Sequence, residues 1–159
     1  MFTLPRLIQE DMDCLDAALD ELIARSEASN AAILDKGGFV VASRGALESY
    51  DLTTLAALAA ASFTANQAIA NLIHETNFSS VYQQGDSFSM LVDNVGEQCL
   101  LVVIFKAQLS VGAVKYYARD TILKVIEQME KARKRTPEEG VDLAMLNVSD
   151  TSQVFRRKS

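Results

Sequence analysis

Apolar residues recur at helical spacing near both ends of the chain. Between residues 4 and 26 they fall on one stripe: Leu4, Ile8, Met12, Leu15, Leu19 and Leu22. Thr3 can cap this helix, and Pro5 suits its first turn. A second stripe begins after the potential cap Ser110 and ends before Pro137: Val111, Val114, Ala118, Ile122, Val125 and Met129. The pattern predicts two helices that pack one face on a core and turn charged residues outward.

Five shorter segments between these helices have the composition of β-strands: 31–36, 38–44, 81–84, 88–93 and 98–106. Short turn sequences separate the first two from each other and the last three from one another, among them Asp35-Lys36-Gly37-Gly38, whose glycines tolerate positive φ. The last strand is continuously apolar from Cys99 to Phe105, which suits a central strand covered on both faces.

A third helical segment, capped by Asp51 or Thr53 and running to about Glu75, contains no charged residue between Leu52 and Ile73. The segment is long enough to span a bilayer, but its residues are largely alanine interspersed with polar side chains. We therefore expect a helix buried on more than one side and no membrane insertion. The element order α-β-β-α-β-β-β-α predicts an α+β fold, a five-stranded and mainly antiparallel sheet with helices on its faces.

The length of 159 residues favours one domain. We expect this domain to occupy residues 1–135, followed by a flexible C-terminal tail over residues 136–159. The tail carries one apolar patch: Val141, Leu143, Met145 and Leu146. Either a short helix that binds a partner or a frayed end is compatible with this patch.

Composition narrows the possible functions. The formal net charge of -6 argues against nucleic acid as a partner, because phosphate binding needs a basic surface. Cys14 and Cys99 lie in apolar-patterned segments and are expected to be buried thiols without a zinc motif or a disulfide framework. The N-terminus runs straight into charged residues and shows no signal peptide, so a cytoplasmic location is expected.

The sequence shows no catalytic constellation. It contains no phosphate-binding glycine loop, no dinucleotide fingerprint and no nucleophile elbow. His74 is the only histidine, and its place at a helix end predicts a structural residue. A solvated helix face, rather than a metal site, is expected for the acidic residues Asp11, Asp13, Asp16, Asp20 and Glu21. We therefore expect no catalytic residue, no metal and no cofactor.

The charge-free helix is the most informative feature. A helix on the surface of a monomer normally shows charge on its outer face, and none is available here. Small side chains allow close approach of another backbone, and the lack of charge removes a desolvation penalty. The outer face is thus predicted to bind another protein through Ala57, Ala60, Ala61, Thr64, Ala65 and Ala68. Burial of the whole helix inside the monomer is the alternative.

The span from about Leu19 to Ala132 resembles the Roadblock family, the dynein light-chain roadblock type. The element order agrees, and the likeness is carried by Asp35-Lys36-Gly37-Gly38-Phe39, Thr54-Leu55-Ala56-Ala57-Leu58 and Asn71-Leu72-Ile73-His74-Glu75. Three further stretches are similar to the bacterial gliding-motility type within that family: Gln83-Gln84-Gly85, Leu101-Val102-Val103-Ile104-Phe105 and Leu109-Ser110-Val111-Gly112-Ala113-Val114-Lys115.

This resemblance implies a Roadblock/profilin-like sandwich and a homodimer whose sheets and middle helices meet across a two-fold axis. It also implies a partner, a small Ras-like GTPase, whose hydrolysis the dimer activates by ordering the GTPase's own switch residues without an arginine finger. A role in cell polarity, and hence a place at a cell pole, follows from the same likeness. A Roadblock scaffold that binds a GTPase without activating it is the main alternative, ahead of a small-molecule sensor or an enzyme.

The sequence departs from the gliding-motility type at one place in the middle helix. That type carries a Gly-Asn pair where this chain has Ala61-Ser62, and Phe63 adds an aromatic ring beside it. A larger residue at a close contact changes which partner fits.

Overall fold

The computed structural model describes residues 4–46 and 50–135. Its elements follow the predicted order: α1 (Gln9–Ser26), β1 (Asn30–Asp35), β2 (Val40–Gly45), α2 (Leu52–Leu72), β3 (Ser80–Gln83), β4 (Phe88–Val95), β5 (Cys99–Lys106) and α3 (Val111–Lys134). The predicted α+β class is therefore confirmed. The apolar tail patch of residues 141–146 and the predicted stop at Pro137 lie outside the described residues.

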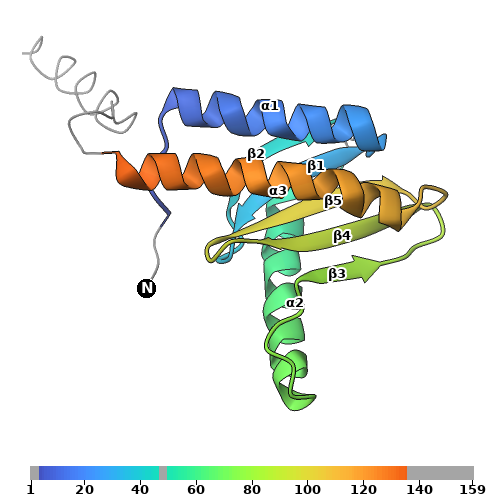
Figure 1. Ribbon diagram of the computed structural model, residues 1–159. Helices are drawn as coiled ribbons and strands as arrows, with labels where there is room; N and C mark the ends of the chain where they lie inside the picture. Colours follow the sequence, from blue (N-terminus) through green and yellow to red (C-terminus); the bar gives the residue numbers. More distant parts are fainter. Residues whose placement is uncertain (1–3, 47–49, 136–159) are drawn as a thin grey trace, which may run out of the picture.

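The five strands form one sheet in the order β2-β1-β5-β4-β3 (Figure 1). Every neighbouring pair is antiparallel. The short turns predicted this for β1–β2, β3–β4 and β4–β5, whereas the β1–β5 pair joins strands that are far apart in the chain. The continuously apolar strand β5 occupies the centre, where it pairs with β1 on one side and β4 on the other. Strand β3 lies at one edge of the sheet.

The helices cover the two faces of the sheet unequally. Helices α1 and α3 lie side by side on one face, whereas α2 crosses the opposite face (Figure 1). Side chains alternate between the faces, so neighbouring residues of β5 belong to different cores. Leu101 and Val103 pack under α1 and α3, whereas Leu100 and Val102 pack under α2.

The beginning of α1 differs from the prediction. The helix begins at Gln9 with Ile8 as its N-cap, so Pro5 lies outside it, and Thr3 is outside the described residues. Asp11 explains this start, because its Oδ2 accepts a hydrogen bond from the backbone N–H of Ile8 at 2.8 Å. A carboxylate in the first helical turn thus satisfies a backbone donor at the helix end.

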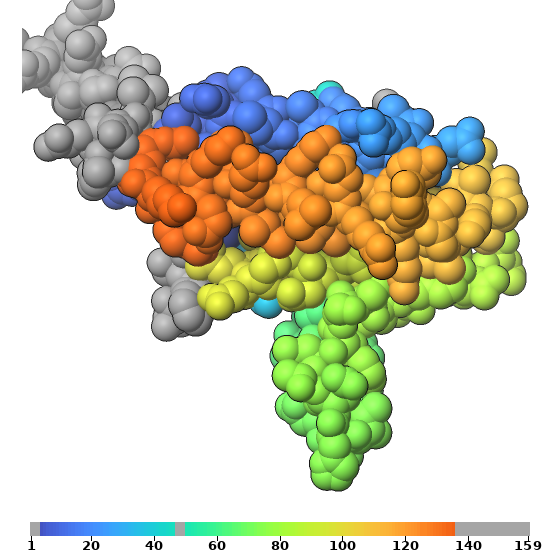
Figure 2. Space-filling model, viewed as in Figure 1, coloured from blue at the N-terminus to red at the C-terminus, as the bar shows by residue number. Residues whose placement is uncertain are grey.

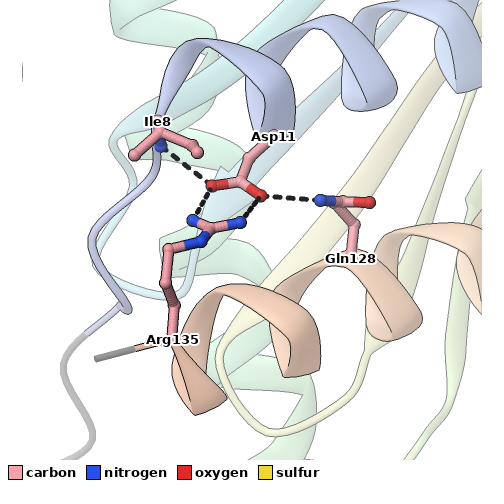
Figure 3. Close-up of polar contacts among 4 residues, drawn as sticks. All are labelled: Ile8, Asp11, Gln128 and Arg135. Atoms are coloured by element: carbon pink, nitrogen blue, oxygen red, sulfur yellow. Dashed lines mark hydrogen bonds and ion pairs between the residues drawn. The ribbon is translucent and has the colours of Figure 1, made fainter. Parts of the chain in front are cut away.

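Asp11 was predicted to lie on a solvated face, and that prediction is wrong. Its side chain is completely buried between α1 and the end of α3 (Figure 3). Arg135 donates two hydrogen bonds to its carboxylate, at 2.7 and 2.9 Å, and Gln128 donates a third at 2.6 Å. The paired arginine holds the pKa of Asp11 down, from 3.8 to about 2.

The other helix ends agree better with the sequence. Asp51 caps α2 by accepting from the N–H of Thr54 at 3.0 Å, and Ser110 caps α3 through the N–H of Ala113. Helix α2 ends at Leu72, three residues before the predicted end, and His74 follows with a left-handed φ of 60°.

The two cysteines differ from each other in exposure. Cys99 is buried as predicted, but Cys14 is exposed on the outer face of α1, so the expectation of two buried thiols is wrong for Cys14.

Candidate partner-binding site

Helix α2 extends beyond the body of the protein. Its C-terminal half projects past the β3 edge of the sheet (Figure 1), and the space-filling view shows it as a stalk (Figure 2). Large apolar side chains are exposed on it: Leu58, Ile69 and Leu72 are 65%, 50% and 81% accessible, and the C-cap residue Ile73 is 63% accessible. A helix end of this kind exposes apolar surface that a soluble monomer normally buries.

The structure places five of the six predicted interface residues on this open side. Ala57, Ala61, Thr64, Ala65 and Ala68 are exposed. Ala60 is the exception, because it is only 4% accessible and packs in the core beneath the sheet. It shares that inner face with Ala56, Ala59 and Phe63, which the sequence pattern could not separate from the outer alanines.

Two stripes run along the exposed side of α2. Ala57, Ala61, Thr64 and Ala68 follow one another at steps of four, three and four residues and form a small-residue stripe. Leu58, Ile69 and Leu72 form a bulky stripe that lies beside it. The two flanks of one helix therefore present different shapes.

The turn between β1 and β2 extends the small-residue stripe. Gly38 sits directly on α2: a Cβ at this position would lie 2.9 Å from the Cα of Ala57, and φ is +93°. Both the space and the backbone conformation thus require glycine. The next residue, Phe39, is 73% accessible, so this turn also exposes an aromatic ring.

A cavity of about 420 Å³ adjoins the small-residue stripe at Thr64. It lies between α2, residues 77–79 and the turns at the ends of the two hairpins. Apolar side chains, among them Phe63 and Leu100, form part of its wall. Thr64 belongs both to the cavity wall and to the exposed stripe, so the two surfaces are continuous.

The polar groups of the cavity are incompletely paired. Gln67 donates from Nε2 to the carbonyl of Phe78 at 3.1 Å, but its buried Oε1 has no hydrogen-bond partner among the described residues. Lys36 donates from Nζ to the carbonyl of Gly96 at 3.3 Å, and burial lowers its pKa. Glu97 supplies the one carboxylate of the wall.

Within residues 4–46 and 50–135, no three histidine, cysteine or acidic side chains lie where they could hold a metal ion. His74 is exposed just beyond the end of α2, at the helix end that the sequence predicted. No helix of this part of the chain is long and apolar enough to cross a membrane.

Sequence reasoning missed the residues that border α2. Phe39 looked like part of a strand, and Lys36 looked like a turn residue. Their nearness to α2 arises only when the hairpin folds onto the helix at Gly38. A lone aromatic residue after two turn glycines is a weak signal that could have marked the exposed ring.

Comparison with known proteins agrees with this architecture. The Roadblock/LC7 domain model matches residues 15–105. A solved structure of MglB with a tetrameric arrangement is 30% identical, with a TM-score of 0.77, and covers 83% of this chain and 99% of that chain.

Two further solved structures extend the comparison. The gliding protein MglB from Thermus thermophilus is 29% identical, with a TM-score of 0.75, covering 82% and 99% of the two chains. Profilin II from Acanthamoeba castellanii is 16% identical, with a TM-score of 0.54, covering 72% of this chain and 98% of that one. The profilin likeness shows the fold alone. No curated protein matched the sequence.

The family model covers more than half of the chain, from within α1 through β1, β2, α2, β3 and β4 into the last residues of β5. The predicted family and the profilin-like fold are thereby confirmed. This chain belongs to the Roadblock/LC7 family, and among solved structures it is similar to MglB.

Proposed function

We propose that this protein is a homodimeric regulator of a small Ras-like GTPase of the MglA type, and that it activates GTP hydrolysis in its partner. The observation that carries the proposal is the exposed, charge-free face of α2, which stands clear of its own sheet. The similarity to MglB supports a regulatory protein.

Two surfaces support the proposal of a homodimer, the β3 edge of the sheet and the bulky stripe of α2. An edge strand leaves backbone N–H and C=O groups unpaired, which a second strand can pair. Helix α2 projects past the same edge, so a second copy that pairs at β3 would also meet the projecting helix (Figure 1). Burial of Leu58, Ile69 and Leu72 would then provide apolar area for association.

The GTPase is assigned to the small-residue stripe. Side chains of alanine size let another backbone approach closely, and no charge has to be desolvated there. Helix α2 carries no arginine, which agrees with an activator that inserts no arginine finger. Such a surface acts by holding the partner's own catalytic groups in place, that is, by positioning.

The test is GTP hydrolysis by the partner with and without this protein. Small Ras-like GTPases of the same genome are the candidates. A large acceleration would support activation, whereas binding without acceleration would favour a scaffold. The variant Ala61→Arg adds an unpaired charge to the stripe and is expected to abolish binding or dimerisation while the fold remains, since Ala61 is exposed in the protomer.

Ala17→Arg is the matched control. Ala17 is also exposed but lies on α1, across the sheet from α2, so this variant should retain both dimer mass and partner affinity. If Ala61→Arg also retains both, the assignment of α2 as an interface is wrong.

A further inference from the structure

The outer face of α3 exposes a second apolar surface, on the side of the sheet away from α2 (Figure 1). Tyr116 and Leu123 are 70% and 66% accessible, and they lie two helical turns apart on the same face of the helix. Neither side chain belongs to one of the two cores. The space-filling view shows the outer face of α3 open (Figure 2), so packing within the protomer does not account for these two residues.

Two opposite charges lie between the apolar residues. Arg119 and Asp120 follow Tyr116 by three and four residues, and Leu123 follows it by seven, so all four side chains share one face. Asp120 pairs with Lys124 at 2.9 Å. Arg119 is exposed, and no carboxylate in the described part of the chain pairs with it. The face therefore consists of an apolar residue, a cation, an anion and an apolar residue, an order that is complementary to its own reverse.

We propose that this face of α3 binds the same face of a second copy, with the two helices antiparallel about a two-fold axis between Arg119 and Asp120. Such an axis brings Tyr116 opposite Leu123 of the second copy and Arg119 opposite its Asp120. Both contacts then occur twice, because a two-fold interface uses the same patch on each side. A parallel arrangement would instead place the two Arg119 side chains against each other. The contact is separate from the proposed dimer interface, because α2 lies on the opposite face of the sheet (Figure 1).

The protomer already holds the groups that this contact needs. Lys124 contacts both Asp120 and Glu21 of α1, so Asp120 is held in place, and Lys124 keeps Glu21 when Asp120 accepts from the incoming arginine. The ring of Tyr116 packs edge-on against Tyr117, with ring centroids 5.3 Å apart. Side chains that are ordered before binding lose less entropy when they bind.

The small size of the patch determines how strong the contact can be. Exposed ion pairs contribute little free energy, so Tyr116 and Leu123 supply most of the attraction. The charges chiefly fix the register and exclude the parallel arrangement. We therefore expect dimers to associate weakly through α3, in a manner that depends on protein concentration.

The first experiment follows the mass of the full-length protein by sedimentation velocity over a range of concentrations at low ionic strength. Arg119→Asp and Asp120→Arg each place like charges together at both sites, whereas the double variant Arg119→Asp/Asp120→Arg restores opposite charges in exchanged positions. We expect each single variant to weaken the association about ten-fold or more, and the double variant to return close to wild-type affinity. Lys131→Asp is the matched control, an exposed charge on α3 two turns beyond Leu123, and should change nothing.

The second experiment tests the register by disulfide formation. Cys14→Ser removes the exposed thiol, and Cys99 is buried. Chains with Tyr116→Cys and chains with Leu123→Cys are oxidised separately and as a mixture. The proposed axis places residue 116 beside residue 123 of the second copy and leaves each residue about 10 Å from its own equivalent, too far for a disulfide. We expect the disulfide only in the mixture.

The outcomes separate this contact from the proposed function. A wild-type protein that shows no association beyond a dimer at any concentration overturns the contact, as does an association that Arg119→Asp leaves unchanged. Failure of the double variant to restore it, or disulfides in the unmixed samples, overturns the register. Altered GTP hydrolysis by the GTPase with unchanged self-association would assign the face to the GTPase instead. Ala61→Arg lies across the sheet and should leave the mixed disulfide intact even if it abolishes GTPase binding.

Discussion

The buried ion pair between Asp11 and Arg135 makes a quantitative prediction for the variant Asp11→Asn. The carboxylate is completely inaccessible, and hydrogen bonds from Arg135 lower its pKa from 3.8 to about 2 (Figure 3). A difference of this size between unfolded and folded protein corresponds to roughly 2.5 kcal/mol of folding free energy. Because the group is buried, solvent screening does not reduce this value much.

Asparagine keeps the shape of the side chain but loses its charge. Its oxygen can still accept from the N–H of Ile8, but its amide nitrogen would oppose the guanidinium donors of Arg135. We therefore expect Asp11→Asn to lower the free energy of unfolding by roughly 2–3 kcal/mol at pH 7. The measurement is urea unfolding followed by circular dichroism at one fixed protein concentration.

The pH dependence has a definite sign. Since the folded pKa lies below the unfolded one, the stabilisation is fully present above 3.8 and is lost as the pH falls towards about 2. At pH 3 about half of it should remain, so the gap between the wild type and Asp11→Asn should narrow accordingly.

Asp13→Asn is the control, because Asp13 is exposed on the same helix and accepts a single hydrogen bond from Gln9. It should change stability by no more than about 0.5 kcal/mol. The reasoning is refuted if Asp11→Asn destabilises no more than Asp13→Asn, or if its effect is equal at pH 7 and pH 3.

Two further predictions concern the turn and the cysteines. Gly38→Ala should lower the free energy of unfolding by about 2 kcal/mol or more, because its methyl group would lie 2.9 Å from the backbone of α2 at a positive φ. Gly37→Ala should lower the free energy of unfolding less, because a Cβ at position 37 would have the flexible end of the Asp35 side chain as its nearest neighbour, at 3.2 Å. Equal decreases in the melting temperature of the two variants would contradict this account. Cys14 should react readily with a thiol reagent in the native protein, whereas Cys99 should not, because it is buried and burial raises its pKa to about 11. Reaction of Cys99 at the rate of Cys14 would show that the β5 core opens.

Much of the fold could be predicted because its signals are local. Strands separated by two to four turn residues can only be antiparallel neighbours, and a continuously apolar strand such as β5 has to lie in the middle of the sheet. The local spacing of the apolar residues in α1 and α3 likewise predicted which face of each helix packs on the core. Each of these inferences needs only residues close together in the chain.

The role of Asp11 could not be read from its neighbours in the same way. Its partner Arg135 lies 124 residues away, and the surrounding aspartates suggested a solvated face. One signal was present, since Asp11 stands three residues after Ile8 and four before Leu15, on the apolar stripe itself. A carboxylate at such a position has to find a donor inside the protein, and the sequence alone does not show which one.

Helix α2 illustrates a different limit. Alanine occupies both faces of this helix, so the hydrophobic pattern does not show which face packs on the core. The periodicity therefore cannot distinguish the inner Ala60 from the outer Ala61. The absence of charge predicted that the outer face binds another protein, which stays a prediction, and the large exposed residues and the neighbouring turn define the two flanks of this face. A two-fold dimer formed through the bulky stripe would leave the small-residue stripe, Phe39 and the cavity free for a different protein. The proposed division of one helix between two kinds of partner thus rests on the placement of its few large side chains rather than on its many small ones.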